Sequence, residues 1–217
     1  MTVVELKQAT LNETLAEHEI ELPEEQVEML DRYCQSLWSW NERINLTRHT
    51  DYQKFVTRDL VDSMAIEPYL ESGGRVLDVG SGGGVPGAVL AILRPDLTVE
   101  LSESVGKRAR VLQEIVNEAG LDIPAHHGRA ETVLEDAIFD TLVVRAVAPL
   151  AKLLTWLEPH WNAFGRLLVL KGPAWVEERQ AAREKGLFRG LKLRKLVSYP
   201  LYGTESESVL LEVRPQE

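Results

Sequence analysis

Glycines cluster at residues 78–87, where the chain reads D-V-G-S-G-G-G-V-P-G. A short apolar run precedes this segment, and the apolar residues 88–93 follow it. A strand, a glycine turn and a helix in that order form a phosphate- or nucleoside-binding turn in doubly wound α/β proteins. Glycine tolerates positive φ angles there, and its missing Cβ lets a ligand approach the backbone. The apolar flanks argue against the alternative, a flexible linker.

One interpretation of this loop is a dinucleotide site. Gly82, Gly84 and Gly87 satisfy the pattern G-x-G-x-x-G. Glu103 follows at a distance that suits an acidic residue bound to a ribose. The short glycine pattern has low specificity by itself, so it leaves the kind of nucleotide open.

A second interpretation begins at Asp78. Together, Asp78, Gly80, Gly82 and Gly84 form D-x-G-x-G-x-G, which resembles the first motif of S-adenosylmethionine-dependent methyltransferases. The amino acid moiety of that cofactor carries an ammonium group and no pyrophosphate. A carboxylate is useful beside an ammonium group and unfavourable beside a pyrophosphate. Asp78 therefore favours S-adenosylmethionine as the cofactor, and its alternative role is to tie the glycine loop by hydrogen bonds.

Polar residues also follow the later predicted strands. Glu103 can accept hydrogen bonds from both ribose hydroxyls, and Ser104 is expected to cap the next helix. Residues 129–131 follow the third strand, where a backbone N–H and a side chain could bind the edge of an adenine ring. Ligands of such sheets bind outside the carboxyl ends of the strands. Arg145 and Lys171, after the fourth and fifth strands, should therefore border the reaction centre.

The elements that would position these residues alternate regularly. Strands are predicted at residues 75–79, 98–102, 123–127, 139–144, 167–171, 192–199 and 209–213, with helices at 85–93, 105–119, 150–160 and 174–185 and a short helical turn at 132–137. This order predicts a Rossmann-like α/β fold with a mainly parallel sheet and helices on both faces. The last two strands have no helix between them, so they should form an antiparallel hairpin. A seven-stranded sheet that ends in this way is typical of one large methyltransferase class.

Three helices are predicted before this region, at residues 3–19, 23–41 and 51–64. Pro23 suits the first position of the second helix, and Asp51 can cap the third. Residues 1–72 would then form a helical extension packed on the core, and residues 73–217 would form the methyltransferase domain. Cys34 is the only cysteine, which excludes an internal disulfide, and its apolar neighbours predict a buried thiol.

The net charge of −10 argues against a general nucleic-acid-binding protein. The charge is uneven, because residues 1–31 hold nine acidic side chains and residues 171–195 hold eight basic ones. This asymmetry predicts either one basic face or two solvated helix faces of opposite sign. The sequence has no apolar run near 18 residues and no charged-then-apolar start, so we expect a cytoplasmic protein without a membrane partner.

Several segments, taken in order, resemble the RsmG family, also named GidB. They are D-V-G-S-G-G-G-V-P-G at 78–87, S-E-S-V-G-K-R at 102–108, R-A-E at 129–131, F-D-T-L-V-V-R-A-V-A at 139–148, L-K-G at 170–172, W-N-E-R-I-N-L-T at 40–47 and D-S at 62–63. The likeness spans roughly residues 30–172. It implies an S-adenosylmethionine-dependent methyltransferase that makes 7-methylguanosine in bacterial 16S rRNA, near the decoding site.

The resemblance also implies a set of cofactor contacts. They are Gly80, Val85, Glu103, Ala130, Glu131 and Arg145. Two positions depart from the family pattern. Val85 stands where the family often has a bulkier Phe or Leu, so the cofactor pocket is expected to differ there. Asp59 stands beside Arg58 where the family usually has His, which would remove a cation or donor from the presumed RNA face.

Guanine N7 carries an in-plane lone pair and no proton, so its methylation needs no general base. The sequence shows no acid–base dyad, and its five scattered histidines have no metal-ligand spacing. The predicted rate enhancement comes from holding N7 in line with the methyl group. Arg145 and Lys171 could orient guanine O6 or a phosphate. Either side chain would instead be scaffold if it pairs with a structural carboxylate.

RNA contacts would need backbone cations and splayed bases. The candidates are Asn45, Arg48, Arg58, Lys107, Arg108 and the basic stretch 171–195.

Binding to a small-subunit particle fits an acidic protein better than binding to naked RNA. The protein is expected to be a monomer. Two alternatives stay open: a methyltransferase of the same fold that acts on another RNA, a protein or a small molecule, and a nucleotide-binding module without catalysis.

Overall fold

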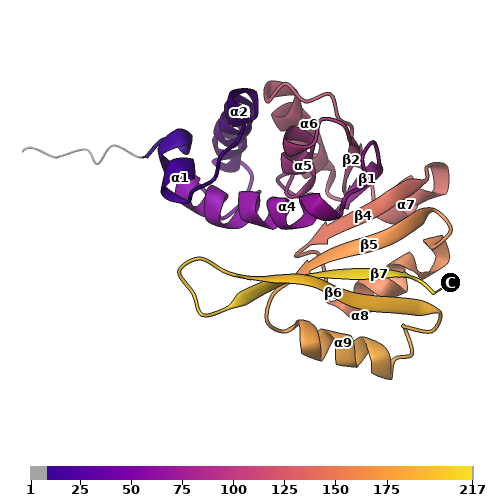
Figure 1. Ribbon diagram of the computed structural model, residues 1–217. Helices are drawn as coiled ribbons and strands as arrows, with labels where there is room; N and C mark the ends of the chain where they lie inside the picture. Colours follow the sequence, from indigo (N-terminus) through magenta and orange to yellow (C-terminus); the bar gives the residue numbers. More distant parts are fainter. Residues whose placement is uncertain (1–8, 217) are drawn as a thin grey trace, which may run out of the picture.

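The computed structural model describes residues 9–216, which contain one seven-stranded sheet in the order β3-β2-β1-β4-β5-β7-β6 (Figure 1). The strands are β1 (Arg75–Val79), β2 (Thr98–Glu103), β3 (Ala125–His127), β4 (Phe139–Arg145), β5 (Phe164–Lys171), β6 (Leu191–Pro200) and β7 (Glu207–Pro215). Strands β1 to β5 pair in parallel, whereas β7 is antiparallel to both β5 and β6. The predicted α/β class and the terminal hairpin are confirmed.

Helices cover both faces of the sheet. One face carries α5 (Gly87–Leu93), α6 (Gly106–Glu118) and the helices that precede the sheet, and the other carries α7 (Ala130–Asp136), α8 (Leu150–Leu157) and α9 (Trp175–Glu184). Successive side chains of a strand point to opposite faces. Val76 and Val143 accordingly pack in the first core, and Leu77 and Val144 pack in the second.

The helices that precede the sheet are α1 (Leu11–Glu17), α2 (Glu24–Asn41), α3 (Tyr52–Lys54), a π-helical turn η1 (Phe55–Leu60), α4 (Val61–Ile66) and a 3₁₀ turn η2 (Glu67–Tyr69). Buried residues of α1, α2 and α4 belong to the same hydrophobic core as α5 and α6, beside which Figure 1 shows α2. The Cys34 thiol is buried in this core, as predicted. The division into an extension and a domain at residue 72 stays a prediction.

Most predicted boundaries agree with the structure to within a few residues. Residues 3–8 of the first predicted helix lie outside the described part. Pro23 is the N-cap of α2 and not its first helical residue, whereas the Asp51 side chain does cap α3, accepting a hydrogen bond from the Lys54 N–H. β5 begins at Phe164, because its first residues pair with β4 beyond the predicted apolar run. No helix within residues 9–216 combines the length and the apolar character needed to cross a membrane.

Candidate cofactor crevice and acceptor pocket

The glycine loop is fastened at both ends by Asp78, the fourth residue of β1. Its Oδ2 atom accepts a hydrogen bond of 2.9 Å from the N–H of Gly87, which opens α5. The hydroxyls of Ser81 and Ser102 donate to the Asp78 carbonyl oxygen, at 3.0 Å each. Asp78 therefore ties the glycine loop by hydrogen bonds, which is the alternative role that the sequence left open. A contact between Asp78 and the ammonium group of a cofactor stays a prediction.

Burial also changes the acidity of this carboxyl group. Asp78 is 1% exposed, and its Oδ1 atom has no hydrogen-bond partner within the described residues. Desolvation raises the pKa of Asp78 to about 6, although the hydrogen bond from Gly87 acts in the opposite direction. At neutral pH the ionised form of Asp78 is therefore destabilised by its burial.

Gly80 allows Val147 to approach the backbone more closely than a residue with a Cβ would allow. Its φ angle is +71°, and a Cβ atom placed on it would lie 2.7 Å from Cγ2 of Val147. Both the backbone angle and the closeness of Val147 require glycine. Gly80 thus lets the loop after β4 pack closely on the glycine turn, and a cofactor contact at Gly80 stays a prediction.

Tyr33 supports the loop from behind, which the sequence did not reveal. It is fully buried on α2, and its hydroxyl donates a hydrogen bond of 2.8 Å to the Gly83 carbonyl oxygen. Burial raises the pKa of the Tyr33 phenol well above its ordinary value, so it stays a neutral donor. A helix of the N-terminal region therefore holds the cofactor loop in place.

A cavity of about 250 Å³ lies beside the loop, and we name it the cofactor crevice. Its lining residues are Val79, Gly80, Ser102, Ser104, Gly128, Arg129, Ala130, Glu131, Val147, Lys152 and Trp156. Three predicted cofactor residues, Gly80, Ala130 and Glu131, are thus brought together. Lys152 and Trp156 were not predicted, because they lie on α8, outside every glycine or acidic motif.

Glu103 joins the glycine loop to the start of α6. Its carboxylate accepts hydrogen bonds from the N–H groups of Val105, at 2.7 Å, and Gly82, at 3.2 Å. The prediction that Ser104 caps α6 is wrong, since its hydroxyl points to Glu103 and α6 has no side-chain cap. The Glu103 carboxylate lies close enough to Val105 to accept the N–H at the start of α6. Ribose binding by Glu103 stays a prediction.

The remaining residues of the predicted cofactor set lie away from the crevice. Val85 is 8% exposed and packs in the hydrophobic core, and it lines neither cavity at this edge of the sheet. Gly82 and Gly84 adopt positive φ angles of 56° and 105° and shape the turn without lining the crevice. Direct cofactor contacts of these three residues stay predictions.

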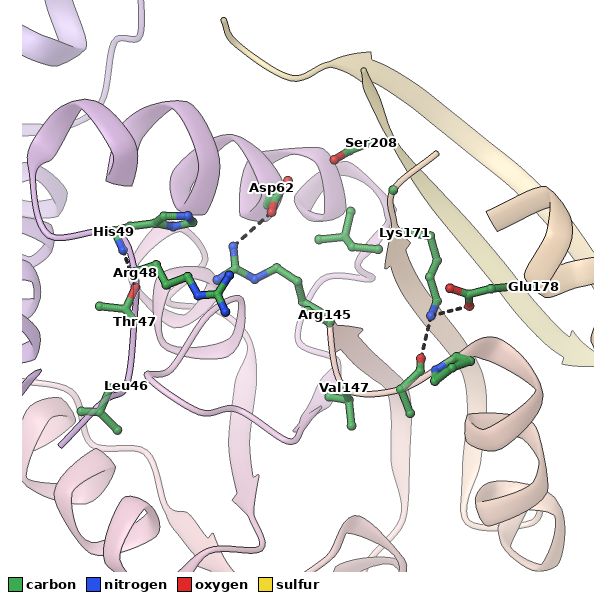
Figure 2. A pocket seen from close by; sticks show the side chains of 15 residues that line it. Leu46, Thr47, Arg48, His49, Asp62, Arg145, Val147, Lys171, Glu178 and Ser208 are labelled. Atoms are coloured by element: carbon green, nitrogen blue, oxygen red, sulfur yellow. Dashed lines mark hydrogen bonds and ion pairs between the residues drawn. The ribbon is translucent and has the colours of Figure 1, made fainter. Parts of the chain in front are cut away.

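A second, larger cavity of about 780 Å³ adjoins the crevice, and we name it the acceptor pocket. It lies between residues 46–49, the loop 145–149 after β4, and the end of β5 (Figure 2). Val147 lines both cavities, so a group held in one lies next to a group held in the other. Ala146, beside it, has a φ angle of +56°, which is strained for a residue with a Cβ.

Arg145 projects from the end of β4 into the wall of this pocket. Its Nη1 atom donates to Oδ1 of Asp59, at 2.6 Å, and to Oδ2 of Asp62, at 3.0 Å. Asp62 also accepts a hydrogen bond of 2.6 Å from the Tyr199 hydroxyl on β6. The two carboxylates raise the pKa of Arg145 against the opposite effect of burial. The guanidinium is therefore a fixed, paired charge.

Lys171 is held in a similar way at the end of β5. Its Nζ atom lies 2.7 Å from Oε2 of Glu178 and donates to the Ala148 carbonyl oxygen at 2.6 Å (Figure 2). The same Glu178 oxygen accepts the N–H of Leu150 at the start of α8. By the criterion set from the sequence, Arg145 and Lys171 are both scaffold in this structure. The carboxylates that bind Arg145 come from a distant segment, whereas Glu178 follows Lys171 on the next helix, α9.

Asp59 is buried directly behind the wall of the acceptor pocket. It is 1% exposed within η1, and the Nδ1 atom of His49 lies 2.9 Å from its Oδ1 atom. Its Oδ2 atom has no partner within the described residues. Asp59 is therefore a buried partner of Arg145 at the pocket wall, and the expected loss of a cation or donor from an RNA face stays a prediction. Its neighbour Arg58 instead donates to the Tyr202 carbonyl oxygen, at 3.4 Å.

Of the five predicted RNA residues that precede the basic stretch, Arg48 alone lines the acceptor pocket, and Lys171 lines it from the basic stretch. Arg108 donates a hydrogen bond of 3.2 Å to the backbone carbonyl of Asn45, so this pair braces the loop before the pocket. Lys107 is exposed on α6. RNA contacts of these residues stay predictions.

The basic stretch 171–195 does not form one face beside the site. Lys171 pairs with Val209 at one end of β7, whereas Lys192 pairs with Arg214 near the other end. At about 3.4 Å per residue, positions 209 and 214 are roughly 17 Å apart. The cations at the start of β6 therefore lie at the far end of the sheet from the acceptor pocket.

His126 and His127, at the end of β3, make packing contacts. His126 contacts Glu100 at 2.7 Å, and His127 closes over Gly106. Within residues 9–216, no three His, Cys, Asp or Glu side chains are grouped so that they could hold a metal ion.

The family model for rRNA small subunit methyltransferase G matches residues 26–202 of this chain. A "Ribosomal RNA small subunit methyltransferase G" from Rhodopirellula baltica is 51% identical over 193 residues, which cover 89% of this chain and 84% of that protein. A protein of the same name from Clostridium novyi is 34% identical, with 86% and 79% of the two chains covered. This chain belongs to the rRNA small subunit methyltransferase G family. It is accordingly an S-adenosylmethionine-dependent rRNA methyltransferase.

Solved structures of lower identity support the fold. An O-methyltransferase from Bacillus cereus in complex with SAH superposes with a TM-score of 0.61 at 14% identity, covering 94% of this chain and 96% of that one. A variant of MtNAS in complex with S-adenosylmethionine gives a TM-score of 0.57 at 18% identity, with 88% and 72% covered. The predicted fold class, family and cofactor are confirmed.

Proposed function

We propose that this member of the rRNA small subunit methyltransferase G family methylates N7 of a guanine in 16S rRNA near the decoding site. The observation that supports it most is the acceptor pocket, which adjoins the cofactor crevice and holds its carboxylates in ion pairs. Asp62 is bound by Arg145 and Tyr199, and Glu178 is bound by Lys171 and a backbone N–H. Both Asp62 oxygens and Oε2 of Glu178 are therefore already bonded. His49, which also lines the pocket, is paired through Nδ1 with Asp59.

An acceptor without a proton suits such a pocket. Guanine N7 attacks through its lone pair, whereas a hydroxyl or amine acceptor must lose a proton to a general base during or after the transfer. S-adenosylmethionine supplies the electrophilic methyl group when it is bound. The chain's own residues contribute position: Val147 borders both cavities and so packs beside both ligands, and Leu46 and Leu170 offer apolar walls to a flat base.

The target base must leave its stack to enter the pocket, as for other enzymes that modify bases. The cavity of about 780 Å³ is large enough for a nucleotide and part of its backbone. We further propose that the substrate is a small-subunit particle, that the enzyme acts as a monomer and that it works in the cytoplasm. The acidic net charge of −10 fits a particle with a shaped surface better than free RNA.

The test is to map 7-methylguanosine in 16S rRNA from a strain that lacks this gene, by chemical cleavage at the methylated base. We expect one modification near the decoding site to disappear and to return with the wild-type gene. Small-subunit particles from the deletion strain should accept one methyl group from S-adenosylmethionine in vitro. Persistence of the modification, with no second enzyme that accounts for it, would contradict the proposal and favour another substrate or a non-catalytic role.

A further inference from the structure

The acceptor pocket contains three cationic side chains of Arg and Lys, and they differ in what they contact. Arg145 is bound by two carboxylates and Lys171 by one. Arg48 is exposed and, among the residues that the structure describes, makes no ion pair and no side-chain hydrogen bond. Figure 2 shows its side chain extending into the pocket. Arg48 is thus the lining Arg or Lys that is available to an anion without breaking an existing pair.

The segment that carries Arg48 is held firmly. Asn41 Oδ1 accepts the N–H groups of Leu46, at 2.8 Å, and Thr47, at 2.9 Å. Trp38 Nε1 donates to the His49 carbonyl oxygen at 2.7 Å. Bonds on both sides of position 48 fix the backbone, so the guanidinium starts from a defined point at the pocket wall. Such preorganisation lowers the entropic cost of binding.

The chemistry of the proposed reaction limits what Arg48 can bind. An arginine that reads guanine usually donates to both O6 and N7. That arrangement would occupy the N7 lone pair, which must stay free to attack the methyl group. A phosphate leaves N7 untouched, and its geometry matches the guanidinium fork. The backbone phosphate of a nucleotide whose base has entered the pocket is therefore the favoured partner.

We propose that Arg48 binds a phosphate of the target nucleotide or its immediate neighbour and so anchors the flipped guanosine in the acceptor pocket. This inference rests on the proposed function, because it takes an RNA nucleotide as the occupant of the pocket. Arg48 acts as a substrate-binding residue, separate from the cofactor crevice, which it does not line.

The experiment compares Arg48→Ala with a charge-matched control, Lys192→Ala. Lys192 is exposed at the far end of β6, and within the described residues its side chain makes no ion pair. Both substitutions remove one positive charge, so they alter long-range attraction similarly. Methyl transfer is measured with small-subunit particles from the deletion strain between 50 and 200 mM KCl, and S-adenosylmethionine affinity is measured by calorimetry.

We expect Arg48→Ala to raise KM for the particles roughly tenfold, with kcat and cofactor affinity close to wild type. The slope of log kcat/KM against log salt should fall by about one unit, as for the loss of one phosphate contact. Arg48→Lys should keep the salt slope and recover only part of the KM, since it keeps the charge and loses the fork. Lys192→Ala should change neither quantity.

Equal KM values and salt slopes for Arg48→Ala and Lys192→Ala would overturn the inference. So would a loss of cofactor affinity as large as the rise in KM, which would assign Arg48 to the cofactor. A sedimentation assay measures the affinity of the same variants for the particles without any catalytic step. A failure of the proposed N7 methylation is thereby distinguished from a failure of Arg48 to bind phosphate.

Discussion

The cofactor crevice and the acceptor pocket lie side by side but are built in different ways. The crevice depends on backbone shape: a glycine turn with positive φ angles, tied by Asp78 and supported by Tyr33. The acceptor pocket depends on side-chain charges that come from different helices and strands and neutralise one another around Arg145 and Lys171. The crevice should therefore be sensitive to added atoms, and the pocket should be sensitive to removed charges.

The largest effect is expected from Asp59→Ala in the pocket network. The substitution leaves Arg145 with one carboxylate and His49 without its partner, so the free energy of unfolding should fall by about 3–5 kcal/mol. Urea denaturation measures the loss, and Asp136→Ala, at an exposed position, is the control. A loss of less than about 1 kcal/mol would show that the network does not hold the pocket together.

Gly80→Ala tests the crevice. The new Cβ would lie 2.7 Å from Val147 at a φ angle of +71°, so we expect the free energy of unfolding to fall by about 3 kcal/mol in urea denaturation. Because Val147 lines the crevice and must shift, the affinity for S-adenosylmethionine should also fall. Gly73→Ala is the matched control, because Gly73 has the same φ angle and no atom within 4 Å of the added Cβ. If both variants bind the cofactor like wild type, the close approach at Gly80 is not part of the site.

Asp78→Asn should change how stability depends on pH. The pKa of Asp78 is raised to about 6, so between pH 4 and 6 the folded protein binds more protons than the unfolded chain. The contribution of Asp78 therefore becomes less favourable as pH rises through this window. Relative to wild type, the variant should gain about 2–3 kcal/mol between pH 4 and 7 in urea denaturation. A constant difference between the two proteins would contradict the raised pKa.

The smallest effect is expected from Tyr199→Phe, which removes one donor from the pocket network. Asp62 would keep its bond to Arg145 and lose the bond of 2.6 Å from the phenol, at a cost of about 1–2 kcal/mol in unfolding free energy. Tyr202→Phe, at a residue that is 56% exposed, should be neutral. Equal stability of the two variants would remove Tyr199 from the network.

Local patterns predicted part of the crevice, because Gly80, Ala130 and Glu131 line it. The alternation of apolar strands with helices predicted the sheet, and the spacing of Asp78, Gly80 and the later glycines predicted the turn, since both depend on neighbouring residues. The same approach assigned the cap of α6 to Ser104 and did not find the bond between Asp59 and Arg145. Both cases concern where a side chain points, which the π-helical turn decides at Asp59 and the reach of Glu103 decides at α6.

By itself, the sequence determined the fold class, the nucleoside-binding turn and, through the family resemblance, the cofactor. Only the tertiary structure decided which cations of the site are free. Arg145 meets Asp59 and Asp62 across 86 and 83 positions of sequence, and these partners share no motif with it. Coulombic pairing depends on distance in space, so the chain must fold before Arg145 is neutralised and Arg48 is left as the lining arginine open to an anion.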